Sequence, residues 1–324
     1  MQKNISPLSN APSPSKREPG GEALLIVIAG PTAIGKTALA IEIAKHFQTE
    51  IISADSRQFF REMSIGTAKP SNEELQAVQH HFINSHSIHD EVSVGTYEKE
   101  ALELLEKLFL IHNIVILVGG SGLYINAVLN GFDNLPEVVE ETRERLNRQL
   151  QEKGMESLQK ELEQADPDYF AEVDINNPQR VIRALEVYYA TGKPFSSYRT
   201  GVKKQRPFNT FVVGLNTERE MLYARINKRV DQMISEGLVD EVKSLYPHRH
   251  LNSLNTVGYS EIFDYLDEKI SLEQAIENIK QNTRRFAKRQ ITWFKKVENI
   301  QWFKPEQKEE ILTYLNSLMN HKKR

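Results

Sequence analysis

The chain has 324 residues, of which 40% are hydrophobic and 26% are charged, with a formal net charge of −3. This length and composition predict a globular protein of one large or two moderate domains with a substantial apolar core. The absence of cysteine excludes disulfides, thiolate catalysis and cysteine zinc sites.

The sequence also argues against a membrane protein and against a secreted protein with a signal peptide. No stretch approaches the roughly 20 apolar residues of a membrane span, so we expect no membrane contact and a cytoplasmic location. Residues 1–22 are rich in Ser, Pro and Asn and lack the apolar segment of a signal peptide. We interpret them as a disordered tail without a role in the mechanism.

The first apolar run, residues 24–29, leads directly into a glycine-flanked loop and an apolar helix at 37–47. The loop fits the phosphate-binding pattern G-x-x-x-x-G-K-S/T at every fixed position. Glycines let consecutive backbone N–H groups point inward, and the helix start adds its positive dipole. The lysine adds a point charge, and the threonine hydroxyl suits a Mg²⁺ ion. We therefore predict a di- or triphosphate site made of Gly30, Pro31, Thr32, Ala33, Ile34, Gly35, Lys36 and Thr37.

The second predicted strand, residues 50–54, ends at Asp55. In parallel sheets, ligands bind at the carboxyl ends of the strands, so Asp55 should face the phosphate loop. A carboxylate at that place is either a magnesium ligand or a base for a nucleophile that attacks near the phosphate. The alternative is a structural cap of the turn.

An amphipathic helix is predicted at 95–112, followed by a buried strand at 113–118 that runs into Gly119-Gly120-Ser121-Gly122. No acid ends this strand, although P-loop ATPases usually carry one there to hold magnesium, which argues against an ATP-driven motor or switch. The double glycine permits a ligand to approach the backbone closely. Ser121 is either a ligand contact or a helix N-cap.

Residues 136–199 predict a helical insertion, with helices at 137–153, 156–164 and 178–190 and no convincing strand. Arg180 and Arg183 lie on one side of the last helix, where they either pair with Glu186 or bind external phosphates. Four histidines at positions 80, 81, 86 and 89 have poor spacing for one metal site, and we do not expect them to bind a metal.

After a strand at 211–215 the chain is nearly all helical, with helices at 217–236, 239–245, 259–266 and 272–296. Arg225 and Arg229 are one turn apart and could hold a pyrophosphate, but spacing alone favours an exposed pair balanced by nearby acids. The last helix carries cations at i,i+4 spacing beside aromatic residues, which suits an RNA backbone or a solvated face. These cations are Arg284, Arg285, Lys288 and Arg289.

Strands alternating with helices predict an α/β fold, a P-loop NTPase-like parallel sheet flanked by helices. We expect this core at 23–135 and 200–324, with the all-helical insertion at 136–199 and a helical C-terminal region. From the residues alone, a P-loop metabolite kinase and a nucleotide-dependent RNA-binding protein remain alternatives to a transferase.

Several motifs in this order resemble the tRNA dimethylallyltransferase family, from about residue 25 to residue 303. They are GPTAIGKT, SADSRQ, IGTAKP, LVGGSGLY, NPQRVIRALEVYYATGKP, LYARINKRVDQMI, VGYSEI and AKRQITWF. The resemblance implies transfer of the dimethylallyl group of dimethylallyl diphosphate to N6 of the adenosine immediately 3′ of a tRNA anticodon. The products would be N6-(dimethylallyl)adenosine and diphosphate.

The resemblance also implies roles for individual residues. Asp55 would be the general base, Thr37 and the diphosphate would bind Mg²⁺, and Lys36 and Arg229 would neutralise the departing diphosphate. Ser121 stands where many members have threonine, which keeps a catalytic hydroxyl, whereas Phe60 replaces a frequent tyrosine. The implied tRNA contacts are Asp55, Ser56, Arg57, Gln58, Ser121, Arg143, Gln179, Arg180, Val181, Ile182 and Arg183, to which we add the cations of the last helix.

The implied partners are the tRNA anticodon stem-loop and dimethylallyl diphosphate, and we expect a monomer. Whether ATP also binds the phosphate loop stays open.

Overall fold

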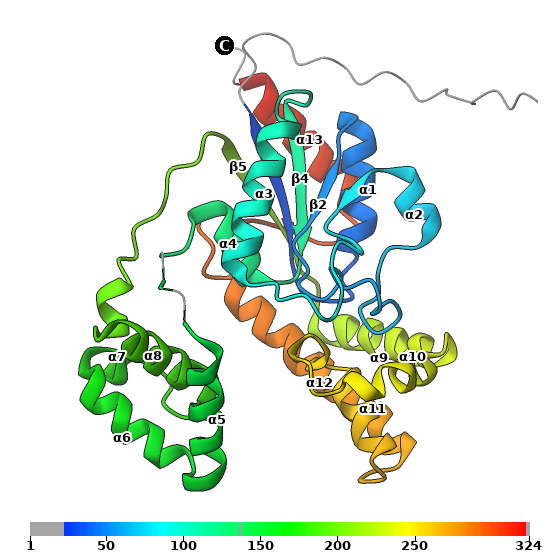
Figure 1. Cartoon of the computed structure of the whole chain (residues 1–324). Helices are drawn as coiled ribbons and strands as arrows, with labels where there is room; N and C mark the ends of the chain where they lie inside the picture. Colours follow the sequence, from blue (N-terminus) through cyan, green and yellow to red (C-terminus); the bar gives the residue numbers. More distant parts are fainter. Residues whose placement is uncertain (1–22, 134, 137, 322–324) are drawn as a thin grey trace, which may run out of the picture. The chain divides into compact units, whose positions relative to one another are not determined.

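The computed structural model describes residues 23–133, 135–136 and 138–321, so the expected tail at 1–22 lies outside the described residues. The described chain divides into two compact units (Figure 1). Residues 23–129 and 206–321 form the core unit, and residues 130–205 form the helical unit. The division thus falls a few residues outside the insertion bounds of 136–199 expected from the sequence.

The core unit is built on one sheet in which every strand pair is parallel, in the order β3-β2-β4-β1-β5-β6. Its strands are β1 (Leu24–Ala29), β2 (Ile51–Ser53), β3 (His80–His81), β4 (Ile114–Gly119), β5 (Asn209–Leu215) and β6 (Gln301–Phe303). The central strand β1 pairs with β4 and β5, with Leu24 opposite Ile114 on one side and Asn209 on the other. This parallel sheet confirms the predicted fold class.

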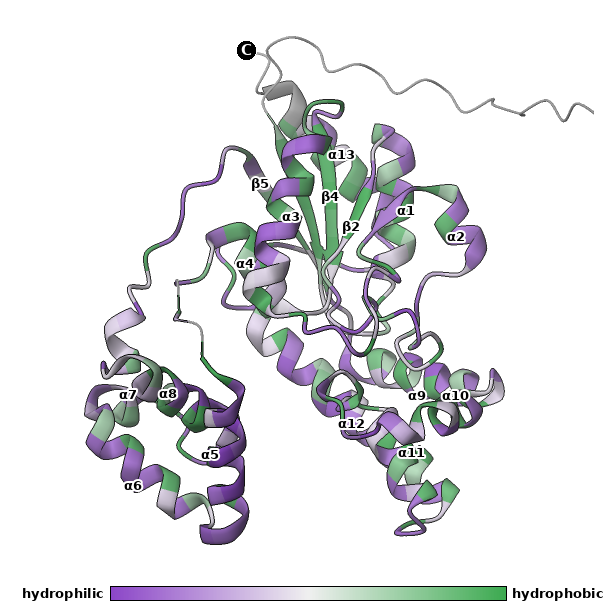
Figure 2. Ribbon diagram, viewed as in Figure 1, coloured by the Kyte–Doolittle hydropathy of each residue, from purple (hydrophilic) through white to green (hydrophobic). Residues whose placement is uncertain are grey.

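Helices cover both faces of the sheet, and β1 is therefore buried along its whole length. Successive side chains of β1 alternate between two apolar clusters, as the period of a strand requires. One cluster contains α1 (Lys36–Phe47) and α13 (Lys308–His321), and the other contains α3 (Val94–Leu108) and α4 (Gly122–Asn130). Figure 2 shows the strands as the most hydrophobic part of this unit.

A third apolar cluster lies among the C-terminal helices, centred on residues such as Val230, Leu238, Tyr259 and Ile279. It joins α9 (Arg219–Ser235), α10 (Leu238–Leu245), α11 (Tyr259–Leu266) and α12 (Leu272–Phe294). Two short 3₁₀ turns, Tyr246–His248 and Asn252–Leu254, connect α10 to α11. A short helix, α2 (Asn72–Ala77), begins at a capping box formed by Ser71 and Glu74.

The helical unit consists of α5 (Glu140–Lys153), α6 (Met155–Ala165), α7 (Pro167–Glu172), α8 (Pro178–Thr191) and the 3₁₀ turn Phe195–Tyr198. It has its own core, in which Leu146, Leu158, Leu162 and Leu185 are fully buried. Helix α8 begins at Asn177, whose side chain accepts a hydrogen bond from the backbone N–H of Arg180.

Several predicted boundaries were wrong by a few residues, and short elements were missed. The helix predicted at 95–112 ends at Leu108, and the C-terminal helix predicted to reach 296 ends at Phe294. Strands β3 and β6 and helix α7 have two, three and six residues, too few to show a period in the sequence. No helix within the described residues is long and apolar enough to cross a membrane.

Candidate active site

The phosphate loop adopts the backbone geometry that its glycines permit. Gly30, Ala33 and Gly35 have φ values of 153°, 62° and 101°. A Cβ on Gly30 would lie 2.7 Å from the carbonyl oxygen of Leu215 on the neighbouring strand, so only glycine fits there. Helix α1 starts at Lys36, immediately after the loop, which places its free N–H groups at the concave side.

Lys36 lies over this loop, and its Nζ donates a hydrogen bond to the Pro31 carbonyl at 2.8 Å. Burial lowers the pKa of Lys36 to about 8, with the nearby Arg229 charge acting in the same direction and Asp55 opposing it. A diphosphate would supply the negative charge that this buried ammonium lacks.

Two arginines of α9 reach the same loop. Arg229 donates to the Thr32 hydroxyl at 3.2 Å, and Arg225 donates to the Ile34 carbonyl at 3.2 Å. The exposed pair that spacing alone favoured is therefore wrong, because α9 turns this face toward the loop. Burial lowers the pKa of Arg229, while the Asp55 charge counteracts it.

Asp55 follows β2 in a tight turn. One carboxylate oxygen accepts a hydrogen bond from the Arg57 backbone N–H at 3.1 Å, which is the structural cap considered from the sequence. The carboxylate still faces the binding space, since Asp55 lines both cavities described below. The structure therefore combines the two readings of this residue, a capped turn and a carboxylate open to a ligand.

Ser121, after β4, joins the Asp55 turn. Its hydroxyl accepts from the Ser56 backbone N–H at 3.1 Å and donates to the Ser56 hydroxyl at 3.2 Å. The glycines before Ser121 allow other parts of the protein to pack closely against the backbone. A Cβ on Gly119 would lie 2.3 Å from the Ala54 carbonyl oxygen, and one on Gly120 would lie 2.4 Å from Gln290 Nε2. These contacts require glycine at both positions, and the approach of a ligand to this double glycine stays a prediction.

Gln290 on α12 is a site residue that the sequence reasoning missed. Its Oε1 accepts from the Thr32 backbone N–H and its Nε2 donates to the Gly120 carbonyl, both at 2.9 Å. Gln290 is only 6% exposed and shares a buried helix face with Ala287 and Phe294. This i−3, i+4 spacing is the signal that could have identified it.

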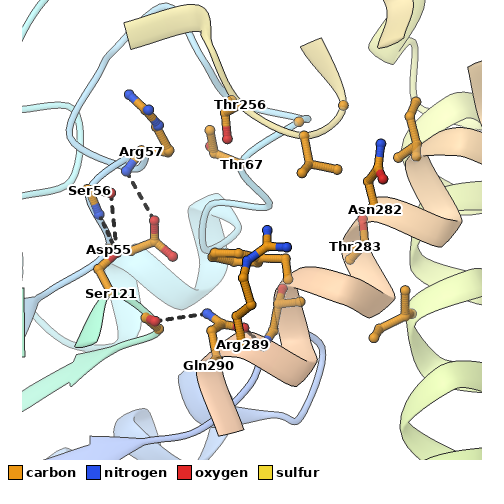
Figure 3. A pocket seen from close by; sticks show the side chains of 18 of the residues that line it. Asp55, Ser56, Arg57, Thr67, Ser121, Thr256, Asn282, Thr283, Arg289 and Gln290 are labelled. Carbon is orange, nitrogen blue, oxygen red and sulfur yellow. Dashed lines mark hydrogen bonds between the residues drawn. The ribbon is translucent and has the colours of Figure 1, made fainter. Parts of the chain in front are cut away.

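Two adjoining cavities meet beside Asp55. The smaller, about 350 Å³, is lined by the phosphate loop and Ser53, and we call it the phosphate compartment. The larger, about 720 Å³, is lined by the Asp55 turn, the Ser121 loop and α12, and we call it the acceptor compartment (Figure 3). The residues common to both are Thr32, Asp55, Arg229, Phe286 and Gln290.

The phosphate compartment fits the magnesium ion that the sequence implies. Thr37 lines it together with Ser53, Asp55 and Glu74, whose side chains carry hydroxyl or carboxylate oxygens. Hard oxygen ligands of this kind are those that Mg²⁺ prefers.

The predicted histidine group has local partners. His81 Nε2 lies 2.6 Å from a Glu50 carboxylate oxygen, and His80 Nδ1 lies 2.8 Å from the Val78 carbonyl. In the part of the chain that the structure describes, no group of three or more His, Asp or Glu could hold a metal.

Arg57 and Gln58 both bond to neighbouring loops. Arg57 donates to the Asn255 carbonyl at 3.1 Å, and Gln58 donates to the carbonyls of Thr67 and Ala68, each at 3.2 Å. Arg57 lines the acceptor compartment and Gln58 lines the phosphate compartment.

The basic side of α12 is largely open to solvent. Arg285, Lys288 and Arg289 are exposed, and Arg289 also lines the acceptor compartment (Figure 3). Arg284 differs, because it is half-buried and donates to the Asn227 side chain at 2.7 Å.

The residues of the helical unit that were predicted to contact RNA differ in their exposure. Gln179 and Arg180 are exposed at the start of α8. Val181 and Ile182 are buried in the core of the unit, so their side chains cannot contact an RNA there, which corrects that part of the prediction.

The two remaining arginines of that set pair with one buried carboxylate. Arg143 lies 2.5 Å and Arg183 lies 3.2 Å from Glu186, whose side chain is 0% exposed. Pairing with Glu186, one of the two alternatives for Arg183, is therefore observed. The side chain of Arg143 remains 53% exposed.

The parallel sheet, with the glycine-flanked loop between β1 and α1, places this protein in the P-loop NTPase-like fold class. The family profile described as IPP transferase matches residues 58–297. This chain belongs to the IPP transferase family, a family of prenyltransferases, which confirms the resemblance seen in its motifs.

Individual relatives agree along almost the whole chain. A Christiangramia forsetii protein named tRNA dimethylallyltransferase is 54% identical over 297 residues, covering 91% of this chain and 98% of the relative. A Bacteroides fragilis protein named tRNA dimethylallyltransferase 1 is 51% identical over 293 residues, covering 90% of this chain and 97% of the relative.

Solved structures give the same picture. The full-length tRNA isopentenylpyrophosphate transferase from Bacillus halodurans has a TM-score of 0.69 and 39% identity, covering 93% of this chain and 98% of that one. A eukaryotic dimethylallyltransferase, described as acting on tRNA, has a TM-score of 0.73 and 29% identity, covering 87% of this chain and 74% of that one.

Proposed function

We propose that this protein transfers the dimethylallyl group of dimethylallyl diphosphate to N6 of the adenosine immediately 3′ of the anticodon in tRNA. The observation that carries this proposal is the place of Asp55 between the phosphate and acceptor compartments. The names of the close relatives support the same reaction. We further propose that the enzyme acts as a monomer in the cytoplasm.

In this reaction N6 attacks C1 of the dimethylallyl group, and the C1–O bond to the diphosphate breaks as the N6–C1 bond forms. The N6 proton passes to the Asp55 carboxylate, which accepts it as a general base. Ser121 fixes the turn that carries Asp55 through its two bonds to Ser56. The leaving diphosphate takes the electron pair of the broken bond.

The phosphate loop would hold the leaving group. Lys36 and Arg229 both bond to this loop and would stabilise the charge that grows on the diphosphate. The buried Lys36 gains most from that anion, because its ammonium lies away from water.

Thr37, which lines the phosphate compartment, would hold Mg²⁺ together with the diphosphate. Bound there, Mg²⁺ supplies a Lewis acid that neutralises diphosphate oxygens.

An adenine amine inside a stacked anticodon loop cannot reach this compartment, so the base must turn out of the stack. The acceptor compartment has the volume for a flipped base and is bordered by Phe286 and Trp293, whose rings can stack on it. The exposed cations Arg285, Lys288 and Arg289 suit contact with the RNA backbone. In the helical unit, Gln179 and Arg180 are exposed, and we propose that they also contact the RNA.

The direct test incubates the protein with Mg²⁺, dimethylallyl diphosphate and an anticodon stem-loop RNA, whose single-stranded loop presents the adenosine. We expect one dimethylallyl group on the adenosine 3′ of the anticodon, detected by mass spectrometry of the digested RNA. The same RNA with guanosine at that position is the matched control. Absence of prenylated adenosine, or ATP consumption with a small metabolite instead, would overturn the proposal.

The base assignment has its own test. Asp55→Ala should lower kcat by about 10²–10⁴-fold, the usual range for loss of a general base. RNA binding should persist, since the cations of α12 are unchanged. A fully active Asp55→Ala would remove Asp55 from the mechanism.

A further inference from the structure

A loop beside the acceptor compartment is held by a carboxylate that the reaction above does not use. Glu241 on α10 accepts backbone hydrogen bonds from Ser64 at 3.0 Å, Ile65 at 2.7 Å and Gly66 at 3.0 Å. Hydrogen bonds to an ionised carboxylate are roughly twice as strong as those between neutral groups. Three such bonds to successive residues fix the course of the loop.

Tyr259, at the start of α11, closes this arrangement from the other side. Its hydroxyl donates to Glu241 at 2.6 Å. Its buried ring covers Gly66 so closely that a Cβ there would lie 2.5 Å from Cε2. Burial and the Glu241 charge raise the pKa of Tyr259, which keeps this phenol a hydrogen-bond donor.

The segment around residues 64–68 is connected to the Asp55 turn by hydrogen bonds of Gln58. Its last carbonyls, on Thr67 and Ala68, accept both hydrogen bonds from Gln58 Nε2. Gln58 Oε1 in turn accepts from the Ser53 hydroxyl at 3.4 Å, and the Gln58 backbone N–H donates to the Asp55 carbonyl at 3.1 Å. Thr67 also lines the acceptor compartment (Figure 3).

We propose that Glu241 is a positioning residue for the transfer reaction: it fixes the loop at 64–66 and, through Gln58, the turn that carries Asp55. This inference rests on the function proposed above. Glu241 lines neither compartment, so it can act on the reacting atoms only indirectly, and the path that we propose runs through the loop and Gln58.

The first test replaces the carboxylate at constant volume. Glu241→Gln presents an NH₂ group to backbone N–H donors, so at least one of the bonds at that end is lost. We expect kcat to fall at least tenfold while the affinity for inorganic pyrophosphate with Mg²⁺, measured by calorimetry, stays within twofold. Asp240→Asn, an exposed acid on the same helix, is the matched control and should keep wild-type turnover.

A second readout does not depend on activity. In Glu241→Gln, amide hydrogen exchange at Ser64, Ile65 and Gly66 should accelerate at least tenfold relative to wild type. Should Glu241→Gln fail to fold, Tyr259→Phe removes one bond to Glu241 while keeping the ring over Gly66, and a smaller loss of kcat is expected. Unchanged exchange together with unchanged kcat would overturn the proposal.

A double-mutant cycle separates positioning from a general structural role. If Glu241 acts through Gln58, Glu241→Gln combined with Gln58→Ala should be no more than twofold slower than the slower single variant. Losses that simply multiply would contradict the proposed path. Failure of the proposed function is distinct from this result, because the wild-type enzyme would then form no prenylated RNA at all.

Discussion

The side-chain amide of Gln290 accepts a hydrogen bond from the backbone N–H of Thr32, across 258 positions of the chain. The same amide donates to the Gly120 carbonyl. The helix that presents the basic side chains is thereby bonded to the phosphate loop and to the loop after β4. Through this contact, α12 holds two loops of the site in register.

Gln290→Ala should lower both the stability of the fold and the affinity for pyrophosphate. Leaving the buried N–H of Thr32 and the carbonyl of Gly120 without their partner costs about 1–3 kcal/mol in the free energy of unfolding. We also expect the Kd for pyrophosphate with Mg²⁺ to rise about tenfold, since 1.4 kcal/mol corresponds to that factor. Urea unfolding and calorimetry measure the two effects.

The matched control is Gln281→Ala, an exposed glutamine on the same helix. It should leave both the free energy of unfolding and pyrophosphate affinity close to wild type. Because alanine is the better helix former, helix propensity predicts no loss in either variant, and equal losses would show that the effect does not come from the bridge.

The general layout of this site could be predicted from the sequence, because it follows from local rules. A glycine-flanked loop after a buried strand implies a phosphate site, and parallel strands bring Asp55 and Ser121 to the same edge. Facts that depend on packing between distant elements were out of reach. The acids near Arg225 and Arg229 suggested an exposed pair, whereas the structure turns both arginines to the phosphate loop.

The double glycine after β4 shows the same limit. A glycine needed for ligand approach and one needed for close packing look identical in a sequence. Only the structure shows that Gly119 packs against Ala54 and Gly120 against Gln290. Likewise, spacing left Arg183 open between pairing with Glu186 and binding phosphates, and the pairing of Glu186 with both Arg183 and Arg143 follows only from the packing of the helical unit.

The depressed pKa of Lys36 predicts a pH-dependent affinity. With a pKa of about 8 in the free protein, the ammonium is charged at pH 7 and mostly neutral at pH 9. A bound diphosphate favours the charged form, so affinity should fall by up to about tenfold per pH unit above pH 8. Calorimetry with pyrophosphate measures this slope, and Lys36→Met, which lacks the titrating group, should show a shallower one.

Lys36 should also make the free energy of unfolding depend on pH, in the direction opposite to the affinity for pyrophosphate. Its pKa is lower in the folded state than the value of 10.5 expected for an exposed lysine, so the unfolded chain binds more protons between about pH 8 and 10.5. The free energy of unfolding should therefore rise with pH across this window relative to that of Lys36→Met. A difference between the two proteins that is constant from pH 7 to 10 would contradict the buried-ammonium interpretation.

Arg229 should act on the leaving group more than on RNA. Arg229→Lys keeps the charge but loses the planar fork that can contact the Thr32 hydroxyl and a diphosphate together. We expect kcat to fall about 10²–10³-fold, the range seen when one charge-stabilising donor is removed. Single-turnover prenylation measures this loss. Lys228→Ala, at the exposed neighbouring position, is the control and should stay within twofold of wild type.

The basic side of α12 yields a prediction that salt can test. Arg285 and Lys288 are exposed and lie outside both compartments, so a charge change there should affect RNA contact and leave the chemical step intact. The double variant Arg285→Gln/Lys288→Gln should raise the KM for the anticodon stem-loop at least tenfold in 0.15 M salt, with kcat within threefold.

Each cation that contacts a single-stranded phosphate contributes about 0.7 to the slope of log affinity against log salt. Loss of two contacts should therefore reduce the slope by about 1.4, as measured by fluorescence anisotropy of labelled RNA. Lys107→Gln/Lys160→Gln provides the matched control, because it removes two positive charges elsewhere and leaves α12 unchanged. If that control lowers RNA affinity as much, net charge and not the α12 face governs binding. An unchanged salt slope in the α12 variant would exclude these two cations from the RNA interface.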